Sequence, residues 1–110
     1  MRGENLGELE ELVLLTVGSL VKDAYAVVIL HEILENTKRK IDVTAIHSVL
    51  RRLENKGYVY SEMGGASKER GGRRKRYFTL TKAGRQALDE TMELRYRLYQ
   101  KLPKLTFIGV

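Results

Sequence analysis

The chain has 110 residues, of which 43% are hydrophobic and 31% charged, and this is the size of a single globular domain with its own core. Because cysteine is absent, disulfides, thiolate metal sites and a cysteine nucleophile are excluded, and the apolar runs are far shorter than the ~20 residues of a membrane span. The formal charge is +6, and its distribution along the chain matters more than its total. We expect a cytoplasmic protein with no membrane among its partners.

Two helices are predicted in the first third of the chain. The apolar residues of 6–20 recur at helical spacing, and the acids in the first turns suit the positive end of a helix dipole. Asp23 is a good N-cap for a second helix over residues 24–36, in which Asn36 is a suitable C-terminal stop. We therefore expect a mostly buried first helix and a second helix with one apolar face.

A third helix is predicted over residues 43–57. Asp42 can cap its start, and Gly57 occupies the position just past the end at which helices often stop. Its apolar residues recur at i, i+3, i+4 and i+7, and they are Ile46, Val49, Leu50 and Leu53. Since these residues must face the core, the opposite side of the helix is expected to be exposed.

The period of the pattern changes after the third helix. Residues 58–63 and 76–80 are rich in aromatic and β-branched residues, and four glycines lie in the polar stretch between them. This pattern predicts a hairpin with a long basic tip. Residues 68–76 hold six basic side chains and one acid, whereas the rest of the chain holds 14 basic and 13 acidic residues. So local an imbalance favours nucleic acid as the partner, and the alternative is a solvated basic loop.

A long last helix is predicted from Thr81 until Pro103 stops it. Its early Gly84 costs about 1 kcal/mol of helix propensity and suggests a close approach by another backbone. The residues on or near its apolar stripe are Ala87, Leu88, Met92, Leu98, Tyr99 and Leu102. A helix of about 20 residues spans ~30 Å, which is more than a small domain can cover, so the apolar stripe would stay exposed to water in a monomer. We expect pairing across a two-fold axis, and the alternative is that the stripe folds back on its own domain.

This order of elements predicts a mainly α fold with a small β hairpin, a winged helix-turn-helix with a long C-terminal dimerisation helix. We expect a DNA-binding domain over residues 1–80, and the dimerisation helix and an apolar tail of unassigned role over residues 81–110. In such a fold helix 42–56 enters the major groove of double-stranded DNA, and the wing, residues 64–76, contacts phosphates or the minor groove.

The candidate DNA contacts come from the exposed side of the third helix, the start of the second helix and the wing. They are Tyr25, Thr44, Ala45, His47, Ser48, Arg51, Lys68, Arg70, Arg73, Arg74 and Lys75. Arg51 can form a bidentate contact with guanine, and Ala45 can touch a thymine methyl group. Thr44 and Ser48 are short donors or acceptors for base edges or phosphates.

Several of these residues, and the neighbouring Arg52 and Arg76, have a second interpretation. Arg51 and Arg52 can form an ordinary solvated helix face, and His47 can be a polar surface residue. Tyr25 is as well explained by a partly buried core position as by a phosphate contact. Arg76 enters a strand on the same face as Phe78, so its stem can instead cover the core.

Two blocks of the sequence, "SVLRRLENKGYV" (48–59) and "GGRRKRYFTLTKAGRQAL" (71–88), resemble the PadR family of bacterial transcriptional regulators. "LGELEELVLLTV" and "YAVVILHEI" resemble its first two helices. The resemblance implies a homodimeric repressor, often one that regulates itself or controls efflux and detoxification genes. The chain departs from the family in having His47 and Ser48 where Tyr-Pro is usual, and in lacking the tryptophan of known drug pockets.

The resemblance also implies that the C-terminal helix and the first helix form the dimer interface. The candidate interface residues are Leu9, Leu12, Leu88, Met92, Leu98, Tyr99 and Leu102. A small-molecule inducer is a further partner to consider, and the sequence does not identify one. No cofactor is expected.

Catalysis is not expected from this sequence. His31 and His47 lie on different predicted helices, and His31 with Glu35 is the only pair with even weak metal-ligand spacing. The glycines of the wing lack the spacing of a phosphate-binding loop and lead into a strand. Two alternatives to a specific regulator remain, a nonspecific nucleic-acid-binding winged helix and a protein-interaction module.

Overall fold

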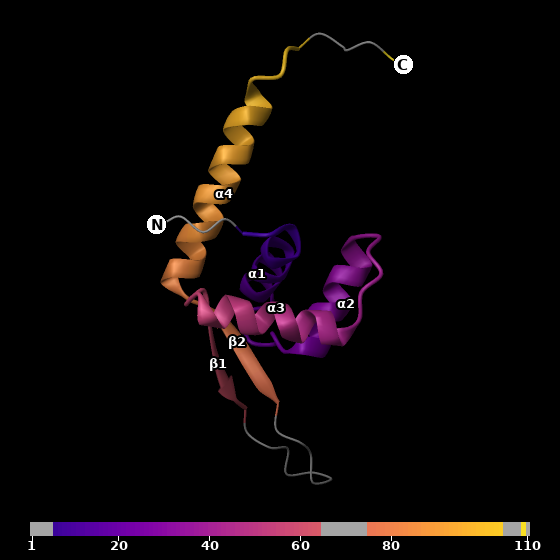
Figure 1. Cartoon of the computed structure of the whole chain (residues 1–110), viewed down its shortest axis with the longest axis vertical. Helices are drawn as coiled ribbons and strands as arrows, with labels where there is room; N and C mark the ends of the chain where they lie inside the picture. Colours follow the sequence, from indigo (N-terminus) through magenta and orange to yellow (C-terminus); the bar gives the residue numbers. More distant parts are fainter. Residues whose placement is uncertain (1–5, 65–74, 105–108, 110) are drawn as a thin grey trace.

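The computed structural model describes residues 6–64, 75–104 and 109. Their elements, in chain order, are α1 (Glu8–Leu20), α2 (Ala26–Asn36), α3 (Val43–Asn55), β1 (Val59–Met63), β2 (Arg76–Leu80) and α4 (Lys82–Gln100) (Figure 1). The predicted fold class is confirmed, because three helices precede an antiparallel hairpin and a long helix follows it.

The core lies where α1, α2 and α3 meet the base of the hairpin and the start of α4. Its largest fully buried side chains are Val13, Leu14, Val17, Ile29, Ile46, Val49, Leu50 and Leu53. Val59, Phe78 and Leu88 extend this cluster from the strands and α4. The four residues predicted as the apolar face of the third helix are thus all in the core.

The predicted cap of the second helix is wrong. The helix starts at Ala26, with Tyr25 as the N-cap residue in an extended conformation and no side-chain cap. The cause is the backbone of Ala24, whose carbonyl oxygen accepts a hydrogen bond of 2.9 Å from the amide of Phe78 in β2. Because this pairing requires Ala24 to face the hairpin, Asp23 lies in the preceding turn, where its carbonyl accepts from the Tyr25 amide.

The ends of α3 and the start of α4 follow the sequence prediction. Asp42 accepts a hydrogen bond of 3.1 Å from the Ala45 amide, and Gly57, at φ +81°, takes the left-handed conformation past the helix end. Thr81 caps α4 by accepting from the Gly84 amide at 3.0 Å. Gly84 lies against the Tyr58 carbonyl, with which an added Cβ would collide, so the predicted close backbone approach is confirmed.

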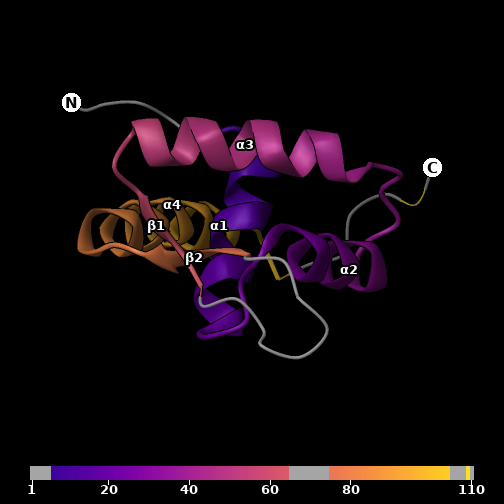
Figure 2. The same cartoon turned by 90° about the horizontal axis from the view of Figure 1, so that it is seen from below.

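The hairpin and α4 extend from opposite sides of the three-helix body (Figure 1). Strand β1 pairs with β2 from Val59↔Leu80 to Met63↔Arg76, and α3 runs across the body beside this hairpin (Figure 2). The first half of α4 packs on the body through Gly84 and Leu88, whereas every residue from Glu93 to Lys104 is exposed. Among the described residues, no helix is both long and apolar enough to cross a membrane.

Candidate nucleic-acid interface

The outer face of α3 carries the five candidate contacts predicted for this helix. Thr44, His47 and Arg51 are exposed, and Ala45 and Ser48 are half-buried. The opposite face of the helix is buried, with no core residue of α3 more than 1% exposed. The predicted division of the helix into a core face and a solvent face is therefore confirmed.

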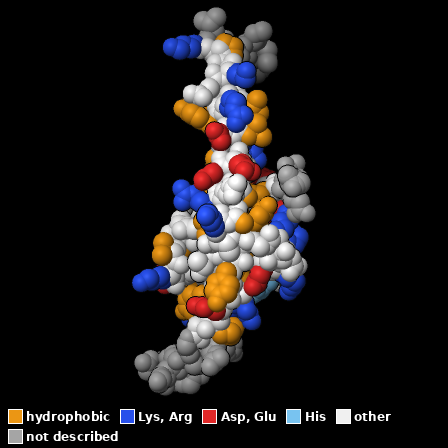
Figure 3. All heavy atoms as spheres, turned by 90° about the vertical axis from the view of Figure 1, so that its left-hand side faces the viewer, with side chains coloured by type: hydrophobic (Ala, Val, Ile, Leu, Met, Phe, Trp, Pro, Cys, Tyr) orange, Lys and Arg blue, Asp and Glu red, His pale blue; other side chains and the backbone are white. Residues whose placement is uncertain are grey.

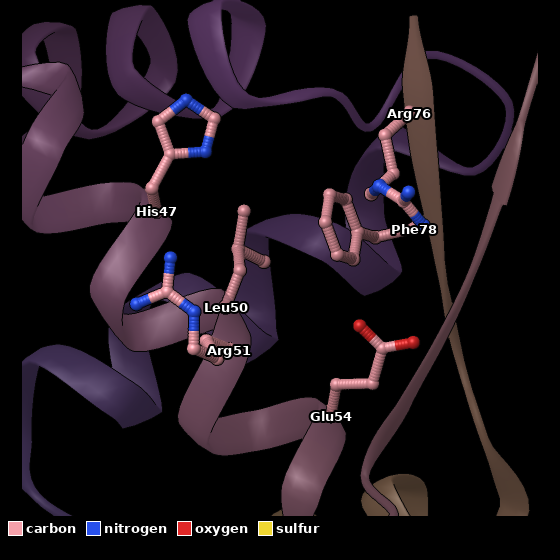
Figure 4. Close-up of a pocket in the computed structure, with 6 residues that line it drawn as sticks. All are labelled: His47, Leu50, Arg51, Glu54, Arg76 and Phe78. Carbon is pink, nitrogen blue, oxygen red and sulfur yellow. The ribbon is translucent and has the colours of Figure 1, made fainter.

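A groove of about 200 Å³ separates this outer face from the wing strand β2 (Figure 4). It is lined by His47, Leu50, Arg51 and Glu54 from α3 and by Arg76 and Phe78 from β2. Leu50 and Phe78 are buried, so the floor of the groove is apolar, and the imidazole and the charged groups lie around its rim. A polyanion that runs from α3 to the wing would meet this rim.

Two tyrosines and a lysine connect the start of α2 with the base of the wing. The rings of Tyr25 and Tyr77 meet edge to face, with centroids 5.3 Å apart and an interplanar angle of 67°. The ammonium of Lys75 lies 4.5 Å from the Tyr25 ring centroid and 3.4 Å from its hydroxyl oxygen. Tyr25 is therefore half-buried against the base of the wing, and the Lys75 ammonium lies on its ring at the surface. This position is compatible with both interpretations of Tyr25, a partly buried tyrosine and a phosphate contact.

The other wing candidates, Lys68, Arg70, Arg73 and Arg74, lie outside the described residues. Lys75 and Arg76 are the members of the basic cluster that the structure places, and both are exposed. Lys75 is next to the paired strands, since its carbonyl accepts a hydrogen bond of 2.6 Å from the Gly64 amide. The described part of the wing therefore presents two adjacent cations at the point where the hairpin leaves the body.

Arg52 of α3 and Lys56, the residue that follows the end of α3, hold the carboxylate of Glu10 on α1. Glu10 is 6% exposed and accepts from Arg52 Nε at 3.2 Å, from Lys56 Nζ at 3.0 Å and from the Gly7 amide at 2.8 Å. Burial, the largest single influence, raises the pKa of Glu10, but the hydrogen bonds from Gly7, Lys56 and Arg52 outweigh it and leave the pKa below its ordinary value. Arg52 is thus part of a structural ion cluster at the end of α3.

Sequence reasoning missed a set of polar residues that joins α3 to the wing. Arg76 Nη1 donates a hydrogen bond of 3.0 Å to Ser61 Oγ, and Ser61 Oγ donates one of 2.7 Å to Glu54 Oε2. The sequence indicates the position of Arg76 alone, because side chains alternate along a strand and Arg76 therefore lies on the same face as Phe78. The contribution of Ser61 and Glu54 depends on how the hairpin packs on α3, and this is a tertiary property.

The candidate interface residues occupy different environments. Leu88 is 5% exposed and belongs to the core of its own chain. Leu9 and Leu12 are partly buried against that core, and Met92 is half-buried on α4. Leu98, Tyr99 and Leu102 are 57%, 69% and 56% exposed on the projecting part of the chain.

The arrangement of α2 and α3 with an antiparallel hairpin after them defines a winged helix-turn-helix protein. Residues 13–90 match the transcriptional regulator PadR-like family, and the chain belongs to this family. Its members are DNA-binding transcription regulators and not enzymes. No curated protein matches the chain.

Solved structures show the same fold. A transcriptional regulator from Streptococcus is 26% identical, with a TM-score of 0.68 over 84% of this chain and 86% of that one. A PadR family transcription regulator from Clostridium difficile R20291 is 23% identical, with a TM-score of 0.69 over 86% of this chain and 93% of that one. The matched region therefore spans most of the length of both of these structures.

Proposed function

We propose that the protein is a homodimeric, sequence-specific transcriptional repressor. In this proposal α3, within residues 42–56, reads base edges in the major groove of double-stranded DNA. The basic wing, residues 64–76, contacts phosphates or the minor groove. The observation that carries the proposal is the exposed face of α3, which holds His47 and Arg51, together with the net charge of +5 that the sequence carries between residues 68 and 76.

The proposed contacts have separate roles. Arg51 is exposed in the groove-facing part of α3, where a bidentate contact with guanine discriminates between bases. The wing cations gain affinity by releasing counterions from phosphates, and this gain does not depend on the base sequence. The half-buried Tyr25 and the Lys75 ammonium beside it supply a further phosphate contact at the start of α2.

The exposed apolar residues of α4 support the homodimer. Leu94, Leu98, Tyr99 and Leu102 are each more than half exposed, and none of them belongs to the hydrophobic core of the described residues. Figure 3 shows hydrophobic side chains at the surface of the projecting part of the molecule. A helix that pairs with its two-fold copy would bury these side chains. Such a dimer presents two α3 helices to half-sites about 34 Å apart, and this spacing implies a pseudo-palindromic operator.

Duplex binding over a salt series tests the function. A labelled duplex from the upstream region of the gene and a scrambled duplex are titrated between about 50 and 200 mM salt. We expect the upstream duplex to bind about 10³-fold tighter, with a steep salt dependence on both duplexes. Equal affinities for every genomic fragment would favour a nonspecific binder, and the absence of binding at low salt would favour a protein-interaction module.

A further inference from the structure

Arg76 is the first residue of β2, and its guanidinium is held by a directed hydrogen-bond chain. Arginine only donates and a carboxylate only accepts, whereas a serine hydroxyl does both. Arg76 Nη1 donates to Ser61 at 3.0 Å, so the single Ser61 proton is directed to Glu54, 2.7 Å away. Arg76 thus donates, Ser61 both accepts and donates, and Glu54 accepts. These two hydrogen bonds therefore hold the Arg76 side chain in place relative to α3.

The same three residues bridge the two parts of the proposed DNA interface. Glu54 lies on α3, one turn after Arg51, and Ser61 and Arg76 lie on β1 and β2. Figure 4 shows the Arg76 and Glu54 side chains turned toward each other at the groove, with the Phe78 ring between their backbones. Glu54 and Arg76 thus line the same groove as His47 and Arg51 of α3.

The guanidinium of Arg76 has more N–H donors than its hydrogen bond to Ser61 uses. It offers five N–H groups, and Ser61 is its only hydrogen-bond partner among the described residues. Arg76 is exposed, and it faces the strip of surface between the major-groove helix and the wing. A DNA strand that is contacted by both α3 and the wing must cross this strip.

We propose that Arg76 binds a phosphodiester of the DNA strand that crosses between α3 and the wing, and that Ser61 and Glu54 are positioning residues for it. This inference rests on the proposed function. Planar guanidinium donors match phosphate oxygens in a bidentate contact. Holding the long side chain in place in the free protein reduces the conformational entropy that is lost on binding.

A variant that keeps the net charge of the protein tests the positioning role separately from the charge of Arg76. Ser61→Ala removes both hydrogen bonds of the chain and leaves the net charge unchanged. We expect it to weaken binding to the upstream duplex by about 2- to 10-fold, the range for one hydrogen bond, with the same slope of log K against log salt. Ser61→Thr keeps the hydroxyl and is expected to restore the affinity.

Arg76→Ala removes the phosphate contact itself. We expect weaker binding to every duplex and a salt slope that is shallower by about one unit. In the double variant, Ser61→Ala is expected to weaken binding no further, because the residue that it positions is gone. Lys101→Ala, an exposed cation at the far end of α4, is the matched control and should leave the slope unchanged. Thermal unfolding and molar mass confirm that each variant is folded and assembled.

The outcomes distinguish this inference from the function on which it rests. If Arg73→Ala makes the slope shallower and Arg76→Ala changes neither slope nor affinity, the Arg76 contact is wrong and the proposed function stands. If the losses from Ser61→Ala and Arg76→Ala add in full, the positioning role is wrong. If the unmodified protein binds no duplex at low salt, the proposed function and the inference fail together.

Discussion

At the residue scale, two arginines of the proposed DNA interface are expected to act in different ways. Arg51→Ala should weaken binding by about 1–3 kcal/mol, chiefly on the true operator, because the lost contact is to a base edge. Arg73→Ala should weaken binding about equally on all duplexes and make the salt slope shallower by about one unit, because its contact is to phosphate. Titration of operator and scrambled duplexes at several salt concentrations measures both effects. An Arg51→Ala loss that is equal on both duplexes would contradict the base-reading role.

Glu10 is expected to make stability depend on acid. Its pKa is lower in the folded chain than the ordinary value of 4.5, so its contribution to stability is present above pH 4.5 and is lost as the pH falls through the folded pKa. Glu10→Gln should lower the free energy of unfolding at neutral pH by about 1–3 kcal/mol, since Arg52 and Lys56 lose their shared carboxylate. The difference from the unmodified protein should shrink below pH 4.5.

Chemical denaturation at a series of pH values measures this dependence. Glu35→Gln, which neutralises an exposed carboxylate on α2, is the control and should change stability little at any pH. A Glu10→Gln difference that stays constant from pH 7 to acid would show that the charge of Glu10 does not stabilise the fold.

At the scale of elements, the features that local sequence determines could be predicted. Helix α3 has a strict apolar period, a capping Asp42 and a terminal Gly57, and each of these acts within a few residues of its own position. The start of α2 could not be predicted in the same way. A good N-cap at Asp23 was overridden by the hydrogen bond between Ala24 and β2, which joins residues far apart in the chain.

The candidate site shows the same limit. The exposed face of α3 followed from the period of its core residues, so His47 and Arg51 could be placed in advance. The Arg76, Ser61 and Glu54 chain could not, because it depends on how a hairpin packs against a helix.

Gly84 provides a stability test of one contact between elements. Gly84→Ala gains about 1 kcal/mol of helix propensity, but its Cβ would collide with the Tyr58 carbonyl, part of a backbone that cannot move alone. We expect a net loss of about 1–3 kcal/mol. Gly18→Ala in α1 is the matched control, because its Cβ meets only the flexible end of Leu80 at 3.2 Å.

Thermal unfolding of the two glycine variants makes the comparison. Gly18→Ala should be close to neutral or stabilising, and Gly84→Ala should lower the melting temperature. Equal melting temperatures for the two variants would mean that the approach of Tyr58 to α4 does not constrain the fold.

At the scale of the whole molecule, two adjacent acids of α1 connect α3 with the projecting helix α4. Glu10 binds Arg52 of α3 and Lys56 just past its end, and the buried Glu11 accepts from Arg95 of α4 at 2.9 and 3.1 Å. Both contacts start from one turn of α1, so this turn links α4 with the end of α3. In a dimer built on α4, this connection would set the distance between the two α3 helices.

Leu98→Glu tests that dimer. Leu98 is 57% exposed, so the change should leave the fold of the chain intact, but in the proposed interface it would bury a charge against the partner helix. We expect a monomer by sedimentation, and a loss of affinity for a two-half-site operator that exceeds the loss for a single half-site, since only the former binds both α3 helices.

Leu34→Glu is the control for this change, because Leu34 is an exposed leucine of α2 and lies outside the proposed interface. It should stay dimeric. A Leu98→Glu protein that remains dimeric and binds the full operator as tightly as the unmodified one would place the two-fold contact elsewhere. Because α1 is tied to α4 through Glu11, the next surface to test would be the half-exposed Leu15 of α1, which is 39% exposed.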